Sequence, residues 1–403
     1  MLNEQVIEQL VDVLVRRIER VNTYTLKKIA EVIKEIKDVP PSKAYDLAMI
    51  LKYGGDYDKI VKEIAKITEL NEKEIDDIFK VVAKKNQVFA KQFYDYKKKK
   101  YIPYEKNIEL QKQVSAIANI TKETYRNLSN TLAFSRKIKD KVVYTSLAQT
   151  YQDVIDEATI SIIQGKDSFN IAMNKVINDL SISGLRTIDW ESGYSRRLDS
   201  SVRMNLMGAL RDFSISIQRQ FGEEYGADGV EISVHERPAP DHADIQGHQF
   251  STKKENNELS EFDKLQNNED CYDYQGNFVS KNYKGHDRRS IGEYNCYHYV
   301  YSVVLGVSKP QYTQEQLDKI NKDNNKGFVL DNKKYTLYEG TQLQRKLELY
   351  IRRLKDKETM IKTSGIDGKL EATQIKLNQM TNKYFELCKK SRLKPKTERL
   401  RLR

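Results

Sequence analysis

The chain has 403 residues, a formal net charge of +11, 39% hydrophobic and 32% charged residues. Its length exceeds that of one small domain and indicates two or three. The low hydrophobic share favours long solvated helices with narrow apolar stripes over one large core, and it is still too high for a wholly disordered chain.

The positive charge is concentrated near the C-terminal end. Residues 331–403 contain 20 Lys and Arg against 9 Asp and Glu, a surplus equal to the net charge of the whole chain. The first 330 residues are therefore balanced. A basic segment of this kind either forms a solvated helix surface or contacts an acidic partner such as nucleic acid, and both interpretations stay open.

Three features predict a soluble protein made in the cytoplasm. Three cysteines are too few for a disulfide framework, which favours a reducing compartment. The first residues lack the basic and apolar regions of a signal peptide. No run approaches the ~20 apolar residues of a membrane span.

Residues 1–183 are expected to form an all-helical domain, because apolar residues recur there at helical spacing. Asn71, with Glu74 three residues later, resembles a capping box and predicts the start of a new helix. The apolar stripes predict core contacts and no catalytic site. Helices are predicted over residues 3–37, 44–51, 57–67, from 71 to about 93 and over much of 105–180.

Residues 184–312 are expected to form a small central α+β core. A helix through residues 206–217 is followed by alternating apolar and polar residues over 230–234, which is typical of a strand. Residues 299–304 predict another strand. The arginines and the asparagine near the start of the helix either hold an anionic group or form a network with aspartates that braces the fold; they are Arg196, Arg197, Arg203 and Asn205.

Residues 313–403 are expected to form a basic helical hairpin or tail. Thr313, followed by Gln316, predicts a capped helix start. Apolar residues seven apart, including Leu370, Leu377 and Tyr384, predict a heptad seam between two helices. The residues from 389 onward are expected to fray unless they are bound.

All five histidines lie between residues 235 and 298. In one hypothesis His242, Cys296 and His298 bind Zn²⁺ with a carboxylate, Asp244 or Asp241, because imidazole and thiolate are preferred zinc ligands. In a second, histidine and aspartate act as acid–base groups in a metal-dependent nuclease or other hydrolase. In a third, these side chains only hydrogen-bond irregular loops.

Several motifs in the same order resemble the phage minor capsid protein 2 family, a relative of the phage Mu F-like head-morphogenesis proteins. They lie at residues 199–205, 230–247, 295–298 and 336–355. The relatives often carry Cys-x2-Cys where this chain has residues 241–244, and the paired cysteines are absent here. The motif residues are Arg203, Asn205, His235, Arg237, Asp241, Gln246, Gly247 and Asn295.

The resemblance implies a structural virion protein, made in the cytoplasm of a host bacterium. It implies a role in head morphogenesis near the portal vertex of a tailed phage, in several copies per particle. The implied partners are the portal protein, the major capsid protein and packaged DNA, with no membrane, no enzymatic reaction and no cofactor other than the zinc ion considered above. The alternatives are the metal-dependent hydrolase and a plain DNA-binding module that uses the basic tail.

Overall fold

The computed structural model describes residues 4–138, 141–254, 258–283, 286–293, 296, 298–366 and 368–400. The protein is mainly helical with small antiparallel sheets, which confirms the predicted fold class. No helix within these ranges is long and apolar enough to cross a membrane.

The chain divides into two compact units, each assembled from three separate segments. We expected three consecutive regions from the sequence instead, 1–183, 184–312 and 313–403. Periodicity identifies helices but cannot show which distant segments return to pack together. The first unit contains Met1–Val11, Glu74–Lys122 and Met204–Thr341, and the second contains Asp12–Lys73, Glu123–Arg203 and Gln342–Arg403.

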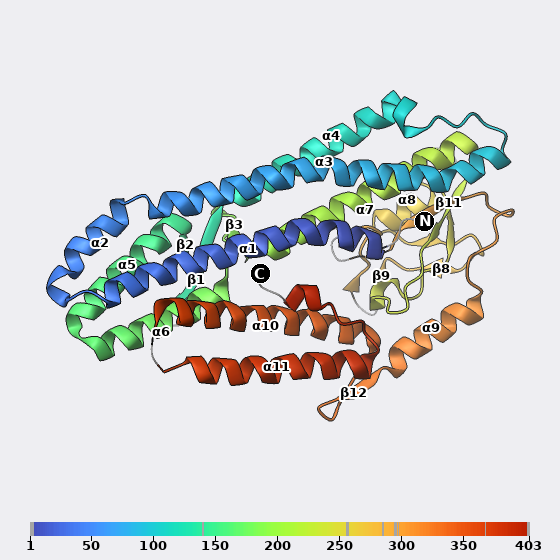
Figure 1. Ribbon diagram of the computed structural model, residues 1–403. Coiled ribbons are helices and arrows are strands. Elements are labelled where there is room, and N and C mark those ends of the chain that lie inside the picture. The colour runs from blue at the N-terminus through green and yellow to red at the C-terminus, as the bar shows by residue number, and fades with distance from the viewer. Residues whose placement is uncertain are drawn as a thin grey trace. The chain divides into compact units, whose positions relative to one another are not determined.

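Long helices form most of the first 130 residues (Figure 1): α1 (Glu4–Lys37), α2 (Ala44–Tyr53), α3 (Asp56–Tyr96) and α4 (Ile108–Asn130). The predicted helix start at Asn71 is wrong, because α3 continues through it. Asn71 is fully buried, donates to Tyr125 Oη at 2.9 Å and accepts from Arg17 at 3.2 Å. Tertiary partners satisfy this side chain, so it does not cap a helix.

A β-hairpin interrupts the region that was expected to be all-helical. Strands β1 (Leu132–Ile138) and β2 (Lys141–Ser146) pair antiparallel, and β3 (Arg186–Ile188) and β4 (Ser195–Arg197) complete a sheet of order β2-β1-β3-β4. Helices α5 (Leu147–Gln164) and α6 (Lys166–Ser183) pack on each other and on β1. The expectation of helices alone is wrong here because Val142, Val143 and Thr145 are β-branched and favour a strand.

The predicted α+β core lies in the first unit. Helix α7 (Leu198–Tyr225) leads to β5 (Gly229–Ile232), which pairs antiparallel with β6 (Gln249–Ser251) on one side and β11 (Val300–Val303) on the other. Both predicted strands, near residues 230 and 300, are confirmed. The buried residues that form its core include Val230, Ile232, Phe250, Phe262 and Val300.

Short elements connect these strands and continue the chain: η3 (Pro240–His242), α8 (Glu261–Gln266), β7 (Cys271–Tyr272), β8 (Phe278–Val279), β9 (Asn282–Tyr283), β10 (His286–Asp287), α9 (Gln314–Lys326), β12 (Phe328–Leu330) and β13 (Lys333–Tyr335). The predicted cap at the start of α9 is confirmed. Thr313 and Gln316 form a reciprocal capping box, in which each side chain accepts a hydrogen bond from the backbone N–H of the other residue.

The C-terminal hairpin consists of α10 (Leu337–Ser364) and α11 (Leu370–Ser391), drawn in red in Figure 1. The heptad seam is confirmed, because Tyr384 packs with Ile351 while Leu377 and Met380 are partly buried against them. The expected fraying is wrong for the described residues up to 400. A 3₁₀ turn, Thr397–Leu400, buries Leu400 against this seam.

Candidate metal centre

The pairing of β5 with β11 brings the predicted ligands together. Ile232, the last residue of β5, lies opposite Val300, the first residue of β11. The segment that follows β5 and the segment that precedes β11 therefore leave the same end of the sheet. His242 ends the 3₁₀ turn in the first segment, and Cys296 and His298 lie in the second.

Three side chains meet in this buried place. The sulfur of Cys296 lies 3.6 Å from Nδ1 of His242 and 3.7 Å from Nδ1 of His298. The ligand atoms of all three residues lie within 4.8 Å of one another. His242 is fully buried, and Cys296 and His298 are each 2% exposed. This set of two imidazoles and one thiol is suited to binding a metal ion.

Carbonyl oxygens fix the orientation of both imidazole rings. Nε2 of His242 lies 2.7 Å from the backbone oxygen of Arg289, and Nε2 of His298 lies 3.5 Å from Oε1 of Gln246. Because a carbonyl oxygen only accepts, each Nε2 carries a proton, and in the neutral ring each Nδ1 has a lone pair directed at the sulfur.

Burial and the close contacts determine the charges in the cluster. Burial opposes ionisation of Cys296 and His242, but their mutual hydrogen bond and attraction outweigh it, so the pKa of the thiol is lowered and that of His242 is raised. Burial, reinforced by the neighbouring histidines, holds the pKa of His298 well below 6.5. Burial and the charge of Arg211 lower the pKa of His235 to about 4. His235 and His298 are thus neutral near pH 7.

Neither expected carboxylate joins the ligand atoms that face the sulfur: Asp241 approaches His242 only at Nε2, at 3.8 Å, and Asp244 is not among the clustered ligands. Asp244 forms a two-pronged ion pair with Arg288, with distances of 2.7 and 2.9 Å. Asp241 pairs in the same way with Arg289, at 2.7 and 2.8 Å. We did not expect either arginine from the sequence, because adjacent charges in a polar stretch are usually solvated, whereas Arg288 is only 3% exposed.

The remaining motif residues surround the cluster or lie apart from it. The ring of His235 contacts that of His298 edge-on, with centroids 4.6 Å apart, and its backbone N–H donates to Oε1 of Gln246 at 2.8 Å. Gly247 has φ +76°, and a Cβ there would lie 2.7 Å from a methyl group of Leu317. Arg237 lies 3.5 Å from Glu236, and Asn295 lies outside the described residues.

Arg197, just before α7, and Arg203, in its first turns, pair with aspartates, as one of the two hypotheses expected. In the second unit, Arg197 donates to Asp199 at 3.2 Å, and Arg352 reaches the same carboxylate at 3.2 Å. Arg203 pairs with Asp12. Their charges are thus compensated within the protein. Asn205 is half-buried on α7.

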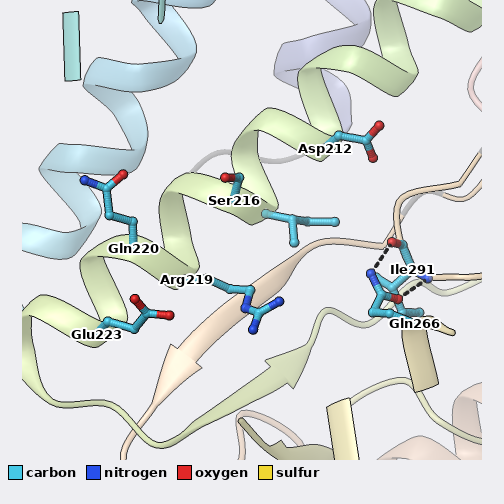
Figure 2. Close-up of a pocket in the computed structure, with 8 residues that line it drawn as sticks. Asp212, Ser216, Arg219, Gln220, Glu223, Gln266 and Ile291 are labelled. Carbon is cyan, nitrogen blue, oxygen red and sulfur yellow. Dashed lines mark hydrogen bonds between the residues drawn. The ribbon is translucent and has the colours of Figure 1, made fainter. Parts of the chain in front are cut away.

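A polar cavity of about 460 Å³ lies beside α7 in the first unit (Figure 2). Asp212 and Arg219 line it from α7. Gln266, the last residue of α8, and Ile291 also line it, and they exchange two hydrogen bonds of 3.0 and 2.7 Å. None of the three clustered ligands lines this cavity. Among the described residues, the cavity and the cluster are therefore lined by different side chains.

Comparison with known proteins identifies the family. The model of the family "Phage minor capsid protein 2" matches residues 2–387, which is nearly the whole chain. Neither the curated proteins nor the solved structures give a significant match. The matched region includes both units and the His/Cys cluster. The chain therefore belongs to the phage minor capsid protein 2 family and is a structural protein of the phage head.

Proposed function

We propose that this head protein acts near the portal vertex during head morphogenesis and contacts packaged DNA through α11. The family match, over residues 2–387, is the observation that carries the proposal. A minor component is present in too few copies to fill the repeated positions of a symmetric shell. The portal vertex occurs once in each head, so a protein bound there is present in few copies. Its neighbours there are the portal protein and the major capsid protein.

The contact with DNA is assigned to a row of lysines on α11. Residues seven apart lie on almost the same side of a helix, with a drift of about 20° per step. Exposed or half-buried lysines occupy four such positions beside the buried seam of the hairpin. Lys390 pairs with Glu386 at 2.7 Å, an exposed contact that phosphate can replace. The row consists of Lys369, the residue directly before α11, and Lys376, Lys383 and Lys390 on the helix.

Some basic residues of the C-terminal region form ion pairs within the protein and are therefore poor candidates for DNA contacts. Arg352 is 9% exposed and faces Asp199 and Glu19, and Arg399 is 7% exposed and lies 3.6 Å from Asp12. These arginines stabilise the second unit. The lysines of α11 are therefore the better candidates for phosphate contacts, which give affinity without sequence specificity.

A salt titration tests the DNA contact. The full chain and a variant with all four row lysines changed to Gln are compared by fluorescence anisotropy on duplex DNA. The slope of log affinity against log salt should weaken by up to ~0.9 for each phosphate that the variant no longer neutralises. The matched control changes the exposed lysines 97–100 to Gln and should keep the original slope. An unchanged slope in the α11 variant would contradict the assignment.

The geometry gives less support to a metal-dependent hydrolase. Such an enzyme needs an open metal position that substrate can reach. His242, Cys296 and His298 are at most 2% exposed, and the nearby carboxylates are held by Arg288 and Arg289. This arrangement favours a structural role for the cluster over turnover.

A further inference from the structure

We propose that His242, Cys296 and His298 bind one structural Zn²⁺ ion. This inference is independent of the proposed function, since it concerns how the α+β core is held together. It rests on the spacing of the ligand atoms, the directions of the lone pairs and the shell of groups around the rings.

The spacing matches that of a tetrahedral zinc site. Bond lengths of about 2.3 Å for Zn–S and 2.0–2.1 Å for Zn–N, at a tetrahedral angle, place the sulfur and each nitrogen about 3.6 Å apart. The two Sγ–Nδ1 distances are 3.6 and 3.7 Å. Both sulfur–nitrogen distances therefore already match those around a bound zinc ion.

With both rings neutral and Cys296 a thiol, hydrogen bonding alone leaves one Nδ1 of this cluster unsatisfied. Both rings donate from Nε2 to carbonyl oxygens, so both Nδ1 atoms face the sulfur of Cys296 as acceptors. One thiol carries one hydrogen and can satisfy only one of them. A buried acceptor without a hydrogen-bond donor lowers the stability of the protein. A divalent cation would bind both nitrogen lone pairs and the thiolate at once.

The shell around the cluster has the form that metal-binding histidines require. A ligating imidazole usually donates its other N–H to a carbonyl or carboxylate, which fixes the ring. Arg289 O and Gln246 Oε1 supply these acceptors. The nitrogen and sulfur donors select zinc over Mg²⁺ and Ca²⁺, which prefer oxygen.

We assign the fourth position to His235. Structural zinc sites are almost always closed by four protein ligands. His235 is half-buried, and its ring already contacts that of His298, with centroids 4.6 Å apart. With this ligand the ion joins the segment after β5 to the segment before β11 and fixes the end of the sheet.

Metal analysis of the full chain tests the site. Protein purified without chelators from zinc-supplemented culture should contain one zinc per chain by elemental mass spectrometry. Replacement with Co²⁺ should give the visible bands of a tetrahedral ion and a thiolate-to-cobalt charge-transfer band. This readout needs no variant, so a folding defect cannot confuse it. Wild-type protein that takes up neither ion stoichiometrically would overturn the proposal.

Matched variants locate the ligands. Cys296→Ser should abolish the charge-transfer band, whereas Cys271→Ser, at a buried cysteine outside the cluster, should retain it. His298→Ala should lose zinc, whereas His248→Ala, which removes a partner of Asp273, should keep it. X-ray absorption of the wild type should show three nitrogens and one sulfur. An oxygen in place of the third nitrogen would refute the assignment of His235.

Discussion

Replacement of Glu19 by Gln should stabilise the protein at alkaline pH. Glu19 lies in the second unit, is 6% exposed, and lies 3.5 Å from Arg352. Burial raises the pKa of its carboxyl to about 7 from 4.5, because the attraction of Arg352 does not fully offset the loss of water and Asp199 adds repulsion. Glutamine keeps the shape of the protonated acid and cannot ionise.

The sign and size of the effect follow from linkage. The folded pKa lies above the unfolded value, so the contribution of Glu19 to stability is complete below pH 4.5 and is lost as the pH rises through 7. Between pH 5 and pH 8 this loss amounts to about 2–3 kcal/mol. The difference in unfolding free energy, variant minus wild type, should therefore grow by about 2–3 kcal/mol over that range.

Urea denaturation followed by helical circular dichroism at each pH measures this difference. Subtracting the wild-type unfolding free energy from that of the variant cancels the contributions of all groups that titrate in both proteins. The control is Glu69→Gln, since Glu69 is exposed on α3 beside Lys73, and its curve should stay nearly flat. A flat curve for Glu19→Gln, or a variant less stable than wild type at pH 8, would refute the reasoning.

Further substitutions test the packing, and unfolding midpoints measure all of them. Leu387→Ala should cost ~2–5 kcal/mol because this side chain is fully buried, whereas Phe385→Ala, at a residue 42% exposed, should change little. Gly247→Ala should destabilise more than Gly276→Ala: both have positive φ, but only the first places a Cβ against a neighbouring side chain. Thr313→Ala should cost ~1 kcal/mol through loss of the cap of α9. Equal effects within either pair, or no effect at the cap, would contradict the corresponding account.

Local signals in the sequence predicted the elements whose stability is also local. The cap at Thr313, the alternation through Ile232 and the heptads through Tyr384 each leave a pattern within one short segment of the sequence. Two paired strands bring their flanking loops together, so His242, Cys296 and His298 lie close to one another, and their role as metal ligands stays a prediction.

Features that depend on distant partners could not be predicted in this way. Asn71 has the sequence of a cap but is satisfied by Tyr125, 54 residues later. Asp244 has the chemistry of a metal ligand, yet Arg288, 44 residues away, holds it. A competing partner of this kind can be identified only from the three-dimensional structure. The same holds for the division into two units, each built from three separate segments.

The composition of purified phage particles tests the central claim most directly. Quantitative mass spectrometry of intact heads, joined with an asymmetric reconstruction by electron cryomicroscopy, should find this chain at low copy number with its density near the portal vertex. Particles that assemble and package DNA normally while lacking the chain would contradict the account.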